Sequence, residues 1–431
     1  MMIRFVVLAL FTACLCMSAS AQIANKPAWI EQEQFLNACE HGDLNAVKAY
    51  LAKGGPIDVK DKFGQPPMLR VARGRAGVGG RDAVATAELL LKAGANVDSK
   101  NDFGTTALFL TEEPSGIISP LRKLLLDHGA NTHTKDKFGL EPWQRPNFYD
   151  HAKIDASDVA WRLLIEGDLA EPPQDITTVR ARPDGATFRM AAVYYGDSTL
   201  FPATFEWTAP EFDKNGESYL FYAAGRENLT GFELKVIPPA IINATNNLGE
   251  TALIRAVQFD NGWLVPKLLG AGALPDVKDK AGFTALRYSV DLDQFATTLG
   301  LLGKADPNML IGGATPLMQA VIWHHSRAVM AYVVARLSIP KLVKEAREMP
   351  SMRQADLALA AAFRRIDINA RNASGRTALY IAVMADNYDA AQQLVELGAN
   401  RTIGDSDGLT PLQLARKNGQ AEFVKLLSRK R

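Results

Sequence analysis

The chain has 431 residues, and 48 Lys and Arg against 47 Asp and Glu give it a formal net charge of +1. This balance excludes the strongly basic surface with which a protein binds nucleic acid or anionic lipid. No segment after the N-terminus approaches the roughly 18 uninterrupted apolar residues of a membrane-spanning helix. We therefore expect neither a nucleic-acid partner nor a membrane span.

Residues 1–21 are typical of a secretory signal peptide. Arg4 provides the positive start, residues 5–17 form an apolar run, and residues 19–21 (Ala-Ser-Ala) have the small-x-small pattern of a cleavage site. We predict cleavage after Ala21 and a mature protein that is periplasmic or secreted.

The cysteine content favours the bacterial periplasm. Cleavage after residue 21 removes Cys14, Cys16 and Arg4, so Cys39 remains alone and the formal charge changes from 48 − 47 = +1 to 47 − 47 = 0. A single cysteine cannot form an intrachain disulfide. Small eukaryotic secreted domains depend on disulfides, whereas the absence of an intrachain disulfide is natural for a large bacterial periplasmic protein.

A short motif that contains an invariant glycine recurs along the rest of the chain. Clear copies begin at Asp61, Asn101, Asp136, Asn246, Asp279, Asn372 and Asp405, and weaker copies begin at Arg182, Asp213 and Leu310. The motif glycines at 216, 249 and 282 are 33 residues apart. A second glycine, as at 54, 94 and 272, stands seven residues before several copies. Two markers in phase indicate an internal structural repeat.

Each position of the repeat has a mechanical role. A threonine such as Thr251 or Thr284 stands where a helix would begin, and its hydroxyl can cap free backbone N–H groups. A leucine pair at 268–269 would fill the core between helices. Gly272 follows the second helix, where a left-handed C-cap is favoured. The unit predicted is turn, helix, loop, helix.

This pattern resembles that of ankyrin-repeat proteins, D-x-x-G-x-T-P-L-H followed by a second helix that ends L-L-x-x-G-A. The resemblance covers most of the mature chain, although the histidine of the motif is replaced in the strong C-terminal copies, for example by Ile254 and Arg287. It implies an all-α solenoid of helix-turn-helix repeats joined by β-turn or hairpin loops. It also implies a protein that acts by binding another protein.

The register of the repeats divides the chain. The expected segments are a signal peptide at 1–21, N-terminal ankyrin repeats at 22–139, an irregular or degenerate repeat region at 140–212, and C-terminal ankyrin repeats at 213–431 with an inserted helical segment at 340–366. Whether 140–212 is a separate small unit stays open.

The glycine- and arginine-rich stretch ARGRAGVGGRDA, residues 72–83, raises the question of a phosphate-binding loop. A loop of that kind needs a lysine and a hydroxyl after Gly79, where Gly80 and Arg81 stand. We interpret the stretch as an insertion between the two helices of one repeat. A basic surface loop at 73–81 that binds an acidic partner is the alternative.

Catalytic and metal-binding motifs are not apparent in the sequence. The six histidines are scattered, and Cys39 stands at a small buried position of a first helix. We therefore predict no catalysis, no cofactor and no metal. The alternative is an active site hidden in 140–212, where the clustered polar candidates are Asp150, His151, Asp155 and Asp158.

A partner surface is expected along the turn tips and first helices, which form the concave face of repeat solenoids. The predicted partner-binding residues, in the first three turns, are Phe63, Phe103, Phe138, Lys62, Lys100 and Lys137. Aromatic rings surrounded by polar groups are typical of interface hot spots. The alternative is that each ring folds back on its neighbouring turn and the lysines are only solvated.

The sequence thus predicts an exported, monomeric, non-catalytic module that binds a partner protein in the cell envelope. The partner is either a toxin or effector enzyme that the module neutralises, as an immunity protein does, or an envelope stress-defence enzyme that it supports. A rigid spacer without a specific ligand is the structural alternative.

Overall fold

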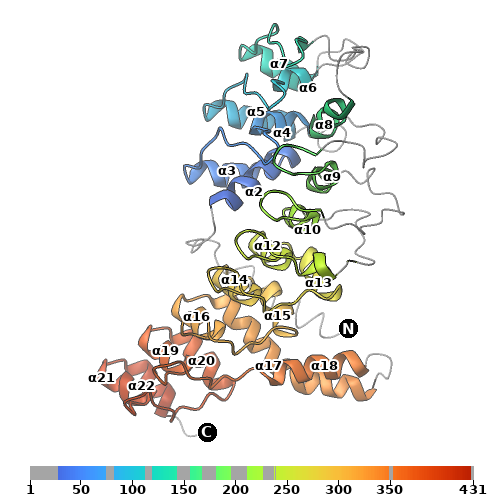
Figure 1. The fold of residues 1–431 in the computed structure, drawn as a ribbon. Helices are drawn as coiled ribbons and strands as arrows, with labels where there is room; N and C mark the ends of the chain where they lie inside the picture. The colour runs from blue at the N-terminus through green and yellow to red at the C-terminus, as the bar shows by residue number, and fades with distance from the viewer. Residues whose placement is uncertain are drawn as a thin grey trace. The chain divides into compact units, whose positions relative to one another are not determined.

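Figure 1 shows the fold in the computed structural model. The structure describes residues 28–73, 82–111, 119–142, 156–166, 181–195, 211–226, 237, 239–348 and 353–428. They are helical without any strand, and only two isolated bridges, Thr245 to Thr251 and Ile311 to Ala314, occur among them. The predicted all-α repeat fold is confirmed. The predicted signal segment lies outside the described residues.

The chain divides into an N-terminal unit, Pro27–Glu233, and a C-terminal unit, Leu234–Arg431. The segment boundaries proposed at 139 and 212 from the repeat register stay predictions. None of the described helices is both long and apolar enough to cross a membrane.

Among the described residues of the N-terminal unit, six helices form a first row and three form a second row. The first row contains α2 (Ala28–His41), α3 (Leu44–Ala52), α4 (Pro67–Arg73), α5 (Asp82–Lys92), α6 (Ala107–Leu110) and α7 (Pro120–Asp127), and the second row contains α8 (Ala156–Glu166), α9 (Phe188–Tyr195) and α10 (Tyr219–Ala224). In the first row α2, α4 and α6 stack on one another, as do their partners α3, α5 and α7. These are consecutive turn-helix-loop-helix repeats.

The turn tips explain the first part of the repeated motif. The Oδ1 atom of Asp61 accepts hydrogen bonds from the backbone N–H groups of Phe63 and Gln65, both at 2.8 Å. Asn101 accepts in the same way from Phe103 at 2.9 Å and Thr105 at 3.0 Å. A carboxylate oxygen and an amide oxygen can both accept these hydrogen bonds, which is why either Asp or Asn occurs at this position.

The first helices begin as the sequence predicts. The threonine Oγ1 atom accepts a hydrogen bond from the N–H group three residues later at Thr251, Thr284, Thr315, Thr377 and Thr410. These caps satisfy backbone donors that the helix itself leaves without partners.

The second row folds back on the first row in reverse order, which the sequence did not predict. The Gln65 side-chain amide donates to the Ile165 carbonyl at 2.7 Å, so the end of α8 lies beside the start of α4. The Asn37 amide donates to the Gly225 carbonyl at 2.9 Å, so the end of α10 lies beside α2. Figure 1 shows α8, α9 and α10 alongside the first row. The second row therefore covers the first-helix side of the first row.

The C-terminal unit is a continuous stack. Its helices are α11 (Pro239–Ile242), α12 (Ala252–Gln258), α13 (Leu264–Gly270), α14 (Ala285–Asp291), α15 (Phe295–Leu302), α16 (Pro316–Ile322), α17 (Ser326–Glu348), α18 (Arg353–Arg364), α19 (Ala378–Met384), α20 (Tyr388–Glu396), α21 (Pro411–Lys417) and α22 (Ala421–Ser428). The first helices α12, α14, α16, α19 and α21 pack in sequence, each on the next. The long helix α17 packs against α18. The two helices contain residues 340–348 and 353–364 of the expected insertion at 340–366.

Two turn glycines of the C-terminal unit allow a matched test of the stacking. Gly249 and Gly282 have φ angles of +77° and +81°. A Cβ atom on Gly249 would lie 2.9 Å from the backbone N of Lys280 in the next turn, whereas one on Gly282 would meet nothing within 4 Å. We expect Gly282→Ala to cost about 1–2 kcal/mol from the left-handed backbone alone, and Gly249→Ala to cost more. Urea unfolding of the whole chain measures the difference, and equal losses would contradict the close approach of successive turns.

Candidate functional site

The aromatic residues of the first three turns are largely inside the molecule. Phe63 is 1% exposed and Phe103 is 5% exposed, while Phe138 is half-buried. The Phe63 ring centroid lies 5.1 Å from that of Tyr194 and 6.1 Å from that of Trp161, both in the second row. The Phe63 ring therefore packs against second-row side chains rather than in solvent. Partner binding by Phe63, Phe103, Phe138 and the lysines stays a prediction.

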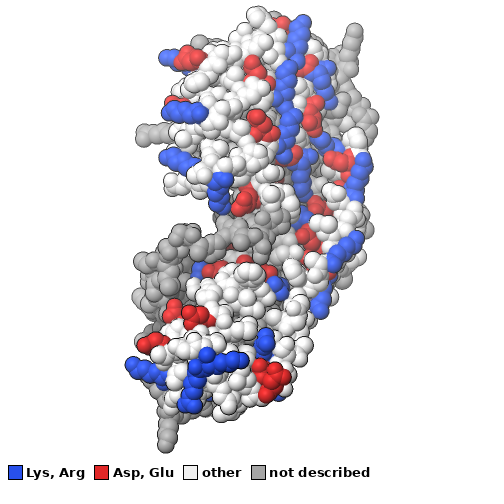
Figure 2. Space-filling view, turned by 90° about the vertical axis from the view of Figure 1, so that its left-hand side faces the viewer, with Lys and Arg blue, Asp and Glu red and all other residues white. Residues whose placement is uncertain are grey.

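The lysines of the turn tips remain at the surface, but two of them have partners within the unit. The Lys62 ammonium lies 2.6 Å from a Glu217 carboxylate oxygen and 4.3 Å from the centroid of a Tyr222 ring. The Lys137 ammonium lies over Phe103, and Lys100 is exposed. Figure 2 shows Lys and Arg side chains in a column on the upper part of the molecule, with acidic side chains beside them.

The structure brings together only half of the predicted binding residues. The rings of Phe103 and Phe138 stack with centroids 6.4 Å apart. The Lys137 ammonium lies 4.1 Å from the Phe103 ring centroid and 4.9 Å from the Phe138 ring centroid. Sequence spacing alone placed these groups in neighbouring turns, and the contact follows from the stacking of those turns.

A buried ionic cluster joins the two rows. Glu40 on α2 lies 3.0 Å from Arg70 and 3.2 Å from Arg226, measured from its Oε2 atom to an Nη2 atom in each case. The Arg73 guanidinium pairs with the other carboxylate oxygen. Burial by itself raises the pKa of Glu40, but these guanidinium groups outweigh it and hold that pKa well below its usual value. The carboxylate is therefore charged and shared between α4 and the end of α10.

A second cluster fastens α8 to the turn tips. The buried Arg162 donates from Nη1 to Asp136 at 2.7 Å and from Nε to Glu166 at 3.1 Å. The Thr105 hydroxyl donates to the same Glu166 side chain at 2.6 Å. Sequence reasoning missed both clusters, because the i,i+4 pair Arg162–Glu166 gives no sign of its other partners, and those partners lie in different repeats.

Asp61 joins the Glu40 cluster through Arg70, and its carboxyl has a raised pKa. Its Oδ2 atom lies 3.2 Å from Arg70 and accepts a hydrogen bond from the Tyr195 hydroxyl at 3.1 Å. Burial raises the pKa of Asp61 to about 6, and the attraction of Arg70 only partly offsets this effect while Glu33 adds to it. Part of the Asp61 population is therefore protonated in mildly acidic solution.

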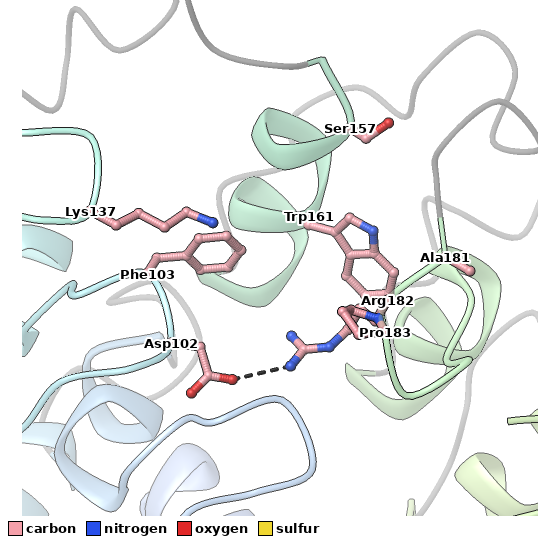
Figure 3. Close-up of a pocket in the computed structure, with 8 residues that line it drawn as sticks. All are labelled: Asp102, Phe103, Lys137, Ser157, Trp161, Ala181, Arg182 and Pro183. Atoms are coloured by element: carbon pink, nitrogen blue, oxygen red, sulfur yellow. Dashed lines mark hydrogen bonds and ion pairs between the residues drawn. The ribbon is translucent and has the colours of Figure 1, made fainter. Parts of the chain in front are cut away.

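A pocket of about 550 Å³ lies between the rows. Its lining residues are Asp102, Phe103, Lys137, Ser157, Trp161, Ala181, Arg182 and Pro183. Figure 3 shows that they come from the turn tips of the first row, from α8 and from the segment before α9. Phe103 and Lys137 were predicted to bind a partner, whereas Trp161 and Arg182 were not singled out in the sequence.

The described residues contain no group of three or more His, Cys, Asp or Glu side chains arranged to hold a metal ion. Cys39 is buried, and burial raises the pKa of its thiol, an effect that Arg70 only partly offsets. This thiol packs as a core side chain. The alternative of an active site in 140–212 was based on four residues. Asp158 lies in α8, and Asp150, His151 and Asp155 lie outside the described residues. Residues 74–81 of the glycine- and arginine-rich loop also lie outside them.

In the C-terminal unit, large apolar side chains are exposed at the ends of first helices. Trp323 follows α16 and is 56% exposed, and Met384 ends α19 and is 46% exposed. The helices pack together, and the His324 Nε2 atom lies 3.1 Å from the Ala385 carbonyl, which brings these two ends side by side. Trp323 and Met384 together are called the Trp323–Met384 patch below.

Residues 352–431 match the family model described as ankyrin repeats, with three copies. This C-terminal segment has the sequence pattern of ankyrin repeats. The human neurogenic locus notch homolog protein 1 is 29% identical over 176 residues, 40% of this chain and 6% of the relative, and the notch relatives from other vertebrates match equally. A putative ankyrin repeat protein of Rickettsia bellii is 38% identical over 64 residues, 15% of this chain and 38% of the relative.

The solved structures that resemble the chain include an ankyrin repeat domain from Acinetobacter baumannii. It is 27% identical with a TM-score of 0.34, and the match covers 44% of this chain and 86% of that domain. The chain spans only about 6% of the length of the notch relatives that it matches. The matched segment is therefore a small part of those proteins.

The burial of Phe63 predicts a core role. We expect Phe63→Ala to lower the free energy of unfolding by about 3–5 kcal/mol, since the ring fills a fully packed site between the rows. Phe138→Ala, at a half-buried ring, should cost less than half as much. Urea unfolding measures both losses, and a Phe63→Ala variant as stable as the native chain would contradict the packing of the rows.

The raised pKa of Asp61, about 6 in the folded chain against an ordinary 3.8, predicts a pH-dependent stability. Between those values the folded state holds a proton that the unfolded state releases, so this group lowers stability as the pH rises from about 4 to about 6. Asp61→Asn keeps the turn, because Asn101 makes the same turn in the next repeat.

The unfolding free energy of Asp61→Asn relative to the native chain should therefore increase by about 2–3 kcal/mol between pH 4 and pH 7. Urea unfolding at intervals of one pH unit measures this difference. A difference that is constant with pH, or that changes in favour of the native chain, would show that the Asp61 pKa is not raised.

Proposed function

We propose that this protein is an exported, non-catalytic module that binds a partner protein in the cell envelope. Ankyrin repeats offer an extended surface of turn tips and first helices to other macromolecules, and this property supports a binding role. Export rests on the sequence of residues 1–21, with its positive start, apolar run and Ala-Ser-Ala site.

The observation that carries the binding proposal is the Trp323–Met384 patch. In the N-terminal unit the first-helix side is occupied by the chain's own second row. In the C-terminal unit Trp323 and Met384 keep more than two fifths of their surface in solvent at neighbouring helix ends. Tryptophan is enriched among interface hot spots, and burying its side chain on association gives a favourable free energy from the hydrophobic effect.

The polar surroundings of the patch favour a protein partner over a lipid surface. The Arg376 Nη1 atom lies 3.7 Å from the Met384 sulfur, and the Arg376 guanidinium lies 5.7 Å from the centroid of the Tyr380 ring. An arginine beside exposed apolar side chains is typical of the centre of protein interfaces. The partner is a toxin to be neutralised or an envelope enzyme to be supported, and its identity decides between an immunity role and a support role.

The test is affinity capture of the exported protein from its own cells after crosslinking in the cell. A Trp323→Ser, Met384→Ser double variant should lose the partner by more than about tenfold, since each hot-spot side chain contributes on the order of 2 kcal/mol. Circular dichroism and urea unfolding establish that the variant is folded.

The matched control is Leu337→Ser on α17, a residue that is 66% exposed and lies away from the first-helix ends. It removes a comparable exposed apolar side chain and should leave capture unchanged. Retention of the partner by the double variant would exclude the Trp323–Met384 patch as the site. Absence of any crosslinked partner with the native chain would favour the spacer alternative.

A further inference from the structure

The most exposed methionine of the described residues lies in the Trp323–Met384 patch. Met384 is 46% exposed at the end of α19. Of the other described methionines, two are half-buried and three are at most 1% exposed: Met309 and Met330 in the first group, and Met68, Met190 and Met318 in the second. A small oxidant reacts first with the side chains that it can reach, so Met384 is the thioether most open to oxidation.

A guanidinium group contacts this sulfur. The Arg376 Nη1 atom lies 3.7 Å from the Met384 Sδ atom, and the Arg376 Nε atom is buried without a hydrogen-bond partner in the described part of the chain. The nearby Asp405 carboxylate accepts hydrogen bonds from the Tyr380 hydroxyl at 2.7 Å and from the Leu409 backbone N–H at 3.0 Å. The Nη1 group therefore faces a thioether, which is a weak hydrogen-bond acceptor.

Hydrogen peroxide supplies all that the oxidation of this sulfur requires. A sulfur lone pair attacks one peroxide oxygen, so that an S–O bond forms and the O–O bond breaks. The second oxygen takes the proton of the first and leaves as water. Sulfur gives up two electrons and peroxide is reduced, so the products are methionine sulfoxide and water.

Arg376 makes the two sides of the sulfur different. A methionine sulfoxide is chiral, because the oxygen can occupy the place of either lone pair. An oxygen on the side of Arg376 accepts a charge-assisted hydrogen bond from the guanidinium, which is stronger than the contact that the thioether makes. The contact therefore stabilises the oxidised side chain and favours one epimer.

Oxidation changes the character of the patch. The Met384 thioether is apolar, and its burial by a partner is favourable. A sulfoxide is polar, and its burial costs free energy unless the partner offers it a hydrogen bond. A partner that fits the thioether therefore binds the oxidised patch more weakly.

We propose that Met384 is a peroxide-sensitive modification site, and that its oxidation to the sulfoxide releases the partner from the Trp323–Met384 patch. Arg376 is the residue that positions the added oxygen. The release rests on the proposed function, because it takes a partner bound at this patch. The modification itself is a property of the chain alone.

The site is tested on the full chain with limiting hydrogen peroxide, followed by digestion and mass spectrometry. Met384 should be oxidised faster than the half-buried Met330, and about tenfold or more faster than the buried Met68 and Met318, whose sulfurs react when the structure opens. In urea all four should react at similar rates, because the folded structure sets the order. Oxidation of Met330 as fast as that of Met384 in the folded chain would overturn the site.

The role of Arg376 is tested by the ratio of the two Met384 sulfoxide epimers. Reductases that are each specific for one epimer measure this ratio, since each leaves the other epimer oxidised. The ratio should be unequal in the native chain and should move toward equality by about twofold or more in Arg376→Leu, which removes the donors. Arg371→Leu is the matched control, because Arg371 donates to the Gly375 and Gly404 carbonyls instead. Equal epimers in the native chain, or the same change in Arg371→Leu, would overturn positioning by Arg376.

The release is tested with purified chain as the bait in affinity capture, after oxidation at Met384 and removal of the peroxide. Capture should fall about tenfold relative to the untreated chain, and it should return when sulfoxide reductases restore the thioether. In Met384→Leu, which has no thioether here, treated and untreated chain should capture equally, each compared with its own untreated level. Met330→Leu should lose capture on treatment as the native chain does.

The outcomes separate this inference from the proposed function. If oxidised and untreated native chain capture a partner equally, the release fails and the proposed function stands. If Met384 is oxidised first but neither form captures a partner, the proposed function fails together with the release, and Met384 remains the site of modification. A loss of capture in treated Met384→Leu as large as that in the native chain would overturn release through Met384.

Discussion

The architecture of the N-terminal unit depends on one carboxylate, that of Glu40 on α2. A buried charge is costly unless it is paired and hydrogen-bonded, and removal of one partner leaves the remaining charges without compensation. Glu40 is paired with Arg70 and Arg73 from α4 and with Arg226 from the end of α10. The charge balance between α2 and α4 is thus completed by Arg226, which follows α10, the last described helix of the second row.

This dependence has a consequence for recognition. Repeat solenoids bind partners with their turn tips and first helices, but in the N-terminal unit that surface is the place where the rows meet. Phe63 lies among Trp161, Tyr194 and Tyr195 rather than in solvent. A pocket of about 550 Å³ lies there between the rows. The C-terminal unit keeps apolar side chains exposed at its first-helix ends.

The sequence by itself determined the repeat unit, because its signals are local. Asp or Asn at the turn, glycine where φ is positive, and threonine at the helix start each act within a few residues, and Asp61, Gly249 and Thr251 behave as their positions predict. Only the tertiary structure decided which faces are covered. The reversal of the second row depends on pairs such as Arg162 with Asp136 and Arg226 with Glu40, whose members lie 26 and 186 residues apart. Coulombic attraction and burial act between groups that are close in space, so no spacing in a single sequence reveals which turn tips remain in solvent.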